Sequence, residues 1–175
     1  GGVNVILNHE SHSWADEFHR RHGVSLCAMA WRVKGAANVL QRAQDYGYPV
    51  WHEKHGPDER ALAAVCAPDG SLIYLIEAPE QGESDIYQTD FNLSETTNQG
   101  TLLGIDHLAL GLVEGSRDNW IMFFRAVFGF ELDNELSVPD PYGLVRSQVM
   151  HSPCHSIRLP LNMSHSLDTQ IARSV

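Results

Sequence analysis

One order of predicted elements occurs twice along the chain, and this repeat restricts the fold more than any other feature of the sequence. Residues 24–77 predict a strand, a helix and three further strands, and residues 104–162 repeat that order. The repeat is one of pattern and hardly one of residue identity. Each copy makes a sheet with one helix to cover it. The sequence therefore predicts an α+β fold of two βαβββ modules, each with a curved mixed or antiparallel sheet.

The first copy is bounded by residues that favour turns and helix ends. Its first strand is apolar up to Gly35, and apolar residues at helical spacing follow until Gly47. A Pro-Asp-Gly turn at residues 67–71 joins its last two strands. Upstream, residues 3–7 alternate like a strand, and residues 11–21 predict a short helix or a covering loop. The elements expected in this copy are a strand at 26–33, a helix at 36–46 and strands at 49–52, 61–66 and 72–76.

The second copy begins with an apolar strand expected at residues 104–112. Ser116 or Asp118 can cap the helix that follows, whose apolar stripe ends at Phe128. Gly129 then stops the helix. The remaining strands are expected at 130–135, 144–150 and 157–161, with turns at 139–143 and 152–153.

A change of composition separates the two copies. Residues 79–103 are rich in polar and turn-prone residues, which predicts a linker over the surface. We therefore expect residues 1–78 and residues 104–175 to belong to separate modules. A new helix is expected from Ser166 or Asp168, and both ends of the chain are expected to be cut.

Charge and composition exclude several classes of function. The formal net charge is −10 and the pI is near 5.3, with no cluster of Lys and Arg to bind nucleic acid or an anionic membrane. No apolar run approaches the ~20 residues that span a bilayer, and no signal peptide is recognisable. Cys27, Cys66 and Cys154 are far apart and lack CxxC spacing, so we expect free buried thiols in a reducing cytoplasm.

Short strings in the second copy narrow the family by their order and spacing. The strings are residues 104–109 (GIDHLA), 123–130 (FFRAVFGF), 143–147 (GLVRS), 158–162 (RLPLN) and 170–171 (QI). In that order they resemble the catalytic domain of 4-hydroxyphenylpyruvate dioxygenases, a family of the vicinal-oxygen-chelate superfamily, whose architecture is paired βαβββ modules.

The resemblance extends upstream and to one subgroup. Stretches within residues 3–76 resemble the second half of the family's non-catalytic N-terminal domain. Residues 139–147, 152–154 and 171–174 resemble bacterial fusion proteins in which a TIM-barrel 3-dehydroshikimate dehydratase precedes a dioxygenase-like domain. The resemblance thus implies that residues 1–78 are the second half of a metal-free N-terminal module pair. Residues 104–175 would be the truncated first module of the catalytic-type domain.

The resemblance also implies a metal site of two histidines and one carboxylate that holds Fe(II) or another divalent metal. His107 matches the family's first histidine ligand, whereas the other two ligands would lie beyond the end of this chain. A lone strand histidine is otherwise usually a hydrogen-bonded core residue. Asp106 is not expected to be a second metal ligand, because adjacent strand residues point to opposite faces, and we interpret it as a strand-edge or capping acid. In the first copy the matching positions fall near Ala28 and Tyr74, so that copy is expected to be metal-free, with Glu77 a solvated acid at a strand end.

Two polar residues match positions that line the family's substrate pocket. The hydroxyl of Ser147 and the amide of Asn162 could hydrogen-bond an aromatic 2-oxo acid. Read from the residues alone, both are equally well explained as polar residues at strand ends. Met163-Ser164 replaces the family's Glu-Pro, a departure that bears on the substrate.

Three functions remain open from the sequence. The chain is either part of an iron-dependent dioxygenase-like domain or a non-catalytic module that supports a 3-dehydroshikimate dehydratase in a fusion protein. A third alternative is a dimeric small-molecule-binding protein of the same superfamily. A single module exposes an apolar sheet face, so we expect the two modules to pair with each other, with further modules or with a second copy of the chain, and the last of these predicts a homo-oligomer. With one histidine, the chain alone is expected to be inactive as a dioxygenase.

Overall fold

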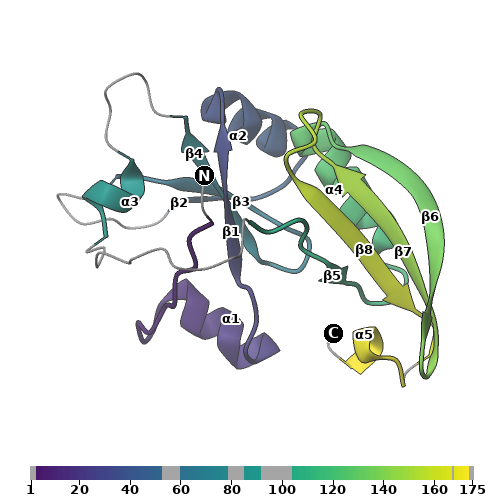
Figure 1. Cartoon of the computed structure of the whole chain (residues 1–175). Helices are drawn as coiled ribbons and strands as arrows, with labels where there is room; N and C mark the ends of the chain where they lie inside the picture. The colour runs from purple at the N-terminus through teal and green to yellow at the C-terminus, as the bar shows by residue number, and fades with distance from the viewer. Residues whose placement is uncertain (1–2, 53–59, 79–84, 92–103, 167, 174–175) are drawn as a thin grey trace. The chain divides into compact units, whose positions relative to one another are not determined.

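The computed structural model describes residues 3–52, 60–78, 85–91, 104–166 and 168–173. The chain divides into two compact units, an N-terminal unit of residues 8–103 and a C-terminal unit of residues 1–7 and 104–175. Each unit holds one four-stranded sheet and its own helices (Figure 1). The predicted α+β fold of two βαβββ modules is confirmed.

The N-terminal unit has a mixed sheet in the order β1-β4-β3-β2. β1 runs parallel to β4, and the other neighbouring strands are antiparallel. Five of its elements match those predicted for the first copy, and α1 is the short helix expected near residues 11–21. The elements are α1 (Trp14–His22), β1 (Ala28–Val33), α2 (Ala36–Asp45), β2 (Val50–His52), β3 (Ala63–Cys66), β4 (Leu72–Glu77) and α3 (Ile86–Thr89).

Both faces of this sheet are buried. Leu72 and Ile76 of β4 point to one face, and Ile73 and Leu75 point to the other, yet none of these four side chains is more than 6% exposed. A strand that is buried on both faces has a continuous run of apolar residues, and the sequence of β4 shows such a run. We assign the Ile73 face to α2, which contacts β2, β3 and β4.

The Leu72 face carries α1 and α3. The strand register places Trp51 and Arg32 on this face. The ring of Trp51 lies 6.3 Å from that of Trp14 in α1, and Arg32 forms an ion pair with Asp85, which caps α3. The face is therefore occupied by helices that lie outside the βαβββ repeat itself.

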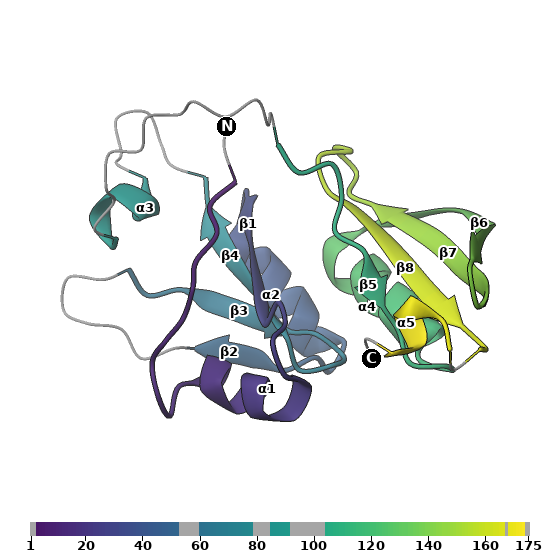
Figure 2. The ribbon, with the colours of Figure 1, turned by 60° about the horizontal axis from the view of Figure 1, so that its bottom comes forward.

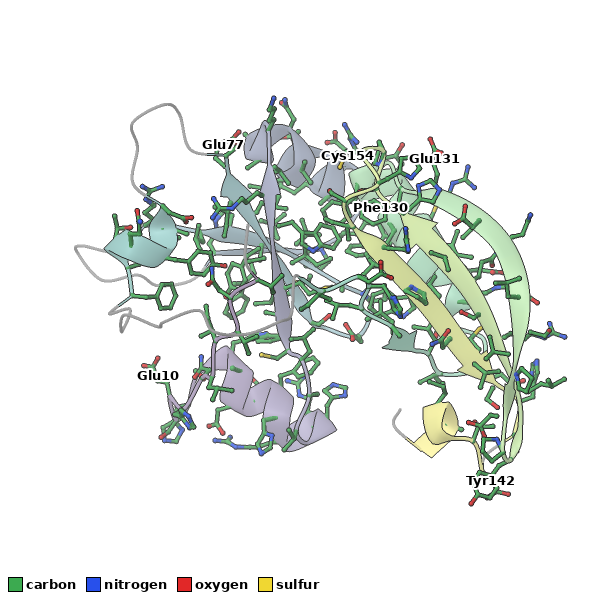
Figure 3. The ribbon with its side chains drawn as sticks, in the orientation of Figure 1. Glu10, Glu77, Phe130, Glu131, Tyr142 and Cys154 are labelled. Carbon is green, nitrogen blue, oxygen red and sulfur yellow. The ribbon has the colours of Figure 1, made fainter. Side chains whose placement is uncertain are left out.

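The first turn of α2 is capped by a distant side chain. Gly35 precedes the helix with a φ of 74°, a left-handed conformation that favours glycine. The carboxylate of Glu77 accepts hydrogen bonds from the backbone N–H groups of Gly35 at 2.7 Å and Ala36 at 2.8 Å. Figure 3 shows Glu77 beside the start of this helix. Glu77 is an exposed acid at a strand end, as expected, and its carboxylate in addition satisfies N–H groups at the start of the helix that have no partner within it.

The C-terminal unit has a sheet in the order β5-β8-β7-β6, with β5 parallel to β8 and the other pairs antiparallel. Its long hairpin exceeds the prediction, since β6 continues to Asp140 and only two residues separate it from β7. The elements are β5 (Leu110–Gly111), α4 (Arg117–Phe128), β6 (Glu131–Asp140), β7 (Gly143–His151), β8 (Arg158–Ser164) and α5 (Gln170–Arg173).

The core of the C-terminal unit lies between α4 and one face of the sheet. The predicted stripe of the helix is buried, with Phe123, Phe124 and Val127 fully shielded from solvent. Met150, Leu159 and Leu161 share one sheet face by register and are also shielded. Figures 1 and 2 both show α4 along one face of this sheet. The helix ends where predicted, at Gly129 with a φ of 70°. Ser116 precedes the helix without capping it, because its hydroxyl donates to the carbonyl of Val113 at 2.7 Å.

Two predicted strands are absent or shortened. Residues 3–7 form no strand, and Val5 and Leu7 are 80% and 78% exposed. Residues 104–109 are likewise irregular, and only Leu110–Gly111 forms a strand. An alternating pattern makes a strand only where a neighbour offers hydrogen bonds, and residues 3–7 have none within the described chain.

The linker expected at residues 79–103 contains α3, while its residues 79–84 and 92–103 lie outside the described structure. In the described ranges no helix is both long and apolar enough to cross a membrane.

Candidate functional site

The face of the C-terminal sheet opposite Leu159 and Leu161 holds two of the three predicted site residues. Ser147 of β7 and Asn162 of β8 are direct partners across the antiparallel pair, so their side chains lie on one face as neighbours. Both are half-buried. The backbone carbonyl of Asn162 accepts a hydrogen bond from the N–H of Leu112 at 2.9 Å, which fixes this row of the sheet to the strand β5.

His107 lies beside β8 of the same sheet, farther along that strand. The N–H of Leu108 donates to the carbonyl of Arg158 at 3.3 Å, so the segment before β5 already follows β8 there. The register of Leu110 with Leu161 places His107 level with Arg158. That position is four residues from Asn162, or about 13 Å at the rise of a strand. The structure thus brings Ser147 and Asn162 together and places His107 at the end of the same sheet.

His107 forms a three-residue cluster with Asp106 and Arg158. Its Nδ1 lies 2.8 Å from an Asp106 carboxylate oxygen, and the guanidinium of Arg158 lies 3.4 and 3.5 Å from the two oxygens of that carboxylate. The hydrogen bond from His107 and then the charge of Arg158 lower the pKa of Asp106. The expectation that Asp106 and His107 point apart is wrong, because these residues are not in a regular strand and strand alternation does not apply.

The described residues fit one position of a metal site rather than a whole site. With Nδ1 engaged by a carboxylate, Nε2 of His107 is the remaining ligating atom, an arrangement common among metal-binding histidines. Across the described ranges, no three His, Cys, Asp or Glu side chains gather as a metal site would require. In the N-terminal unit the matching positions are Ala28 and Tyr74, neither of which is a histidine or carboxylate. A complete site would therefore need ligands from elsewhere.

The face of the C-terminal sheet that bears Ser147 and Asn162 corresponds to the Leu72 face of the N-terminal sheet. The two faces differ in how far they are covered. In the N-terminal unit this face bears Leu72 and Ile76, which are buried beneath additional helices. In the C-terminal unit it bears Leu136 and Val138 of β6, which are 60% and 45% exposed. The second sheet is thus exposed on this face along β6 and carries half-buried polar groups in its centre, although Val145 and His151 on the same face are buried.

The turn between β7 and β8 holds a second cluster that the sequence reasoning missed. The rings of His151 and His155 stack with centroids 4.4 Å apart, and Nε2 of His151 lies 3.3 Å from Asp133. Figure 3 shows Cys154 at this turn. The two serines flanking Cys154, at positions 152 and 156, were the available signal for its environment.

The prediction of three buried thiols is wrong for Cys154. All three cysteines are free, but Cys154 is exposed whereas Cys27 and Cys66 are half-buried. Hydrogen bonds from the hydroxyls of Ser152 and Ser156 lower the pKa of Cys154 to about 7. Burial instead raises the pKa values of Cys27 and Cys66.

Comparison with known proteins identifies relatives of this chain. The sequence profile of the family described as "Hydroxyphenylpyruvate dioxygenase, HPPD, N-terminal" matches residues 1–92. A 3-dehydroshikimate dehydratase of Pseudomonas aeruginosa is 45% identical over all of this chain, which spans 28% of that protein. A 4-hydroxyphenylpyruvate dioxygenase of Pseudomonas sp. (strain P.J. 874) is 35% identical over 95% of this chain, which spans 47% of it.

Solved structures show the same fold. A fusion of a xylose isomerase-like TIM barrel with a 4-hydroxyphenylpyruvate dioxygenase has a TM-score of 0.73 and 41% identity, covering 96% of this chain and 26% of the fusion. A mutant 4-hydroxymandelate synthase from Streptomyces coelicolor has a TM-score of 0.71 at 15% identity, covering 94% of this chain and 49% of the synthase. At 15% identity, the likeness to the synthase shows the fold alone.

Two βαβββ modules in one chain define a protein of the vicinal-oxygen-chelate class. Within that class the match over residues 1–92 is specific. The chain belongs to the hydroxyphenylpyruvate dioxygenase N-terminal family.

Proposed function

We propose that the chain is part of a 4-hydroxyphenylpyruvate dioxygenase-like oxygenase domain that acts on an aromatic 2-oxo acid with Fe(II) or another divalent metal. The observation that supports this proposal best is the partly exposed sheet face on which Ser147 and Asn162 are cross-strand partners. His107 stands at the end of the same sheet with one ring nitrogen held by a carboxylate. The 35% identity to a 4-hydroxyphenylpyruvate dioxygenase over 95% of the chain adds to it.

Each residue has a distinct role in this proposal. Nε2 of His107 is one metal ligand, and the hydroxyl of Ser147 and the amide of Asn162 hydrogen-bond the substrate. A bound divalent ion would orient a 2-oxo acid and activate oxygen beside it. The aromatic 2-oxo acid would lie along the face between these residues, whose partly apolar surface suits a ring.

The proposal assigns the remaining metal ligands to sequence outside the 175 residues. Residues 1–78 are then the second half of a metal-free N-terminal module pair, and residues 104–175 the first module of the catalytic-type domain, joined by residues 79–103. The chain alone is expected to consume no oxygen with a 2-oxo acid and ferrous iron. Steady oxygen uptake by the purified chain, measured with an oxygen electrode, would contradict this division.

Metal binding tests the role of His107. Divalent affinity should be measured by calorimetry on this chain and on a longer chain that includes the following module of the family, each with and without His107→Ala. Only the longer wild-type chain is expected to bind stoichiometric metal. His165→Ala is a matched control, because His165 is an exposed histidine of the same unit that is paired with Glu114. Equal binding after His107→Ala would reject the metal role.

The proposal also includes the oligomeric state, the class of partner and the cellular location. The exposed Leu136 and Val138 support pairing of this face with another module or a second copy, so we infer a homo-oligomer. The acidic charge of −10 supports a small-molecule partner rather than nucleic acid or a membrane. The free thiols agree with a cytoplasmic location.

A second candidate is a non-catalytic module that supports a 3-dehydroshikimate dehydratase in a fusion protein. The 45% identity to such a dehydratase and the likeness to a TIM-barrel fusion favour it. Under this alternative, removing the module from a full-length fusion should lower oligomerisation and thermal stability. A longer chain that binds no metal and consumes no oxygen would make this alternative the better one.

A further inference from the structure

Asp106 and His107 are adjacent in the sequence and touch through their side chains. In a regular strand they would point to opposite faces. Because residues 104–109 are irregular, Nδ1 of His107 reaches an Asp106 oxygen at 2.8 Å. Arg158, on the neighbouring β8, contacts both oxygens of the same carboxylate and accepts the backbone N–H of Leu108 through its own carbonyl. Arg158 therefore anchors the segment through both side chain and backbone.

This contact dictates where the imidazole proton lies. A neutral imidazole carries one N–H, and an ionised carboxylate can only accept a hydrogen bond. Nδ1 must therefore carry the proton, which leaves the lone pair on Nε2. Without the carboxylate the ring could place its proton on either nitrogen and turn about its side-chain bonds.

We propose that Asp106 is a positioning residue for His107, which it holds in the Nδ1–H form so that Nε2 is presented as the ligating atom. This inference rests on the proposed role of His107 as a metal ligand. Arg158 assists by keeping the carboxylate ionised and oriented. A carboxylate behind a ligating histidine typically strengthens metal binding.

One other histidine of the same unit is an internal standard. Nδ1 of His165 lies 2.7 Å from Glu114, which predicts the same Nδ1–H form. His151 is no standard, because its Nε2 lies 3.3 Å from Asp133 and its Nδ1 lies 3.4 Å from the carbonyl of Ser152, so both ring nitrogens face acceptors. The structure thus predicts the Nδ1–H form for both His107 and His165, and both rings can be followed in one spectrum.

Nitrogen NMR of the metal-free chain tests the inference, since proton positions on histidine must be measured rather than seen at ordinary resolution. Spectra of the ¹⁵N-labelled chain at pH ~8, above the ordinary histidine pKa of about 6.5, report the neutral ring. We expect His107 in the Nδ1–H form in the wild type. Asp106→Ala should move it towards the Nε2–H form that free histidine prefers. Asp106 has a 72% exposed side chain, so this truncation should leave the fold intact.

Glu114→Ala is the matched control, because it should change His165 and leave His107 unchanged. An Nε2–H ring at His107 in the wild type, or a ring indifferent to Asp106→Ala, would overturn the inference. In the longer, metal-binding chain Asp106→Ala should weaken divalent affinity by about 10–100-fold. The two proposals fail separately, because the proton position is measured without metal. If His107→Ala does not alter metal affinity, the proposed function fails whatever the ring shows.

Discussion

At the scale of single residues, short-range contacts decide the roles that sequence patterns leave undefined. Glu77 ends a strand, and in the sequence it resembles any other solvated acid. Its carboxylate nevertheless accepts two helix N–H groups, and these hydrogen bonds, from Ala36 and then Gly35, lower its pKa below its ordinary value of 4.5. The contact joins residues 42 and 41 positions apart, a distance over which no local pattern carries information.

Glu77→Gln should therefore destabilise the N-terminal unit at neutral pH, because a neutral amide accepts these hydrogen bonds more weakly. A carboxyl with a lowered folded-state pKa stabilises the fold above its unfolded pKa and loses that effect as pH falls through the folded value. The difference between wild type and variant should thus vanish in acid, below the ordinary value of 4.5. Urea unfolding across pH measures it. Glu131→Gln, at an exposed glutamate that begins β6, is the control for the change of charge.

Cys154 gives a second test at this scale. With a pKa of about 7 it is half thiolate near neutral pH, whereas burial raises the pKa values of Cys27 and Cys66. Because the thiolate is the nucleophile, iodoacetamide should modify Cys154 first, at a rate that rises with pH and levels off above about 7. Peptide mass spectrometry identifies the site. Ser156→Ala should shift this rate profile to higher pH, and preferential labelling of Cys27 would contradict the assignment.

At the scale of elements, prediction succeeded where local pattern and packing agree. The apolar spacing of α4 identified its buried stripe, and Gly129 gave its end, since both are properties of the segment itself. Residues 3–7 failed, because a strand also needs a neighbour to accept its hydrogen bonds. The pairing of Ser147 with Asn162 follows from strand register, which the turn lengths allowed but did not specify. The contact between Asp106 and His107 depends on an irregular backbone that no periodicity predicts.

The packing of α4 predicts unequal effects of two neighbouring substitutions. Phe123 is fully buried, so Phe123→Ala should cost about 3–5 kcal/mol of unfolding free energy by leaving a cavity. Met122 on the same helix is 60% exposed, and Met122→Ala should change stability by less than about 0.5 kcal/mol. Urea unfolding of both variants measures the difference. Similar losses in the two would show that the helix packs by another face.

At the scale of the whole molecule, the two units share a fold and differ in what occupies one sheet face. Their order of strands is the same, with a parallel pair at one edge and an antiparallel hairpin after it. The sequence indicated this likeness from its repeat. It could not indicate that α1 and α3 attach to only one of the sheets, because that depends on contacts between distant segments such as Arg32 and Asp85.

The net charge of −10 predicts the behaviour of the chain towards polyanions. Above its pI of 5.3 the chain should pass through a heparin column in low salt and bind an anion exchanger. A basic protein of equal size serves as the control for the heparin column. Retention on heparin that salt reverses would show a basic surface and reopen the possibility of a nucleic-acid partner.

The filled sheet face of the N-terminal unit has a consequence for how such a chain can change over generations. Trp14 and Trp51 occupy that face together, so a substitution of either one disturbs packing and is removed by selection on stability. Ser147 and Asn162 are half-buried on a partly exposed face, where a new side chain displaces fewer neighbours. Packing therefore restricts substitutions on this face of the first module more than on the corresponding face of the second module.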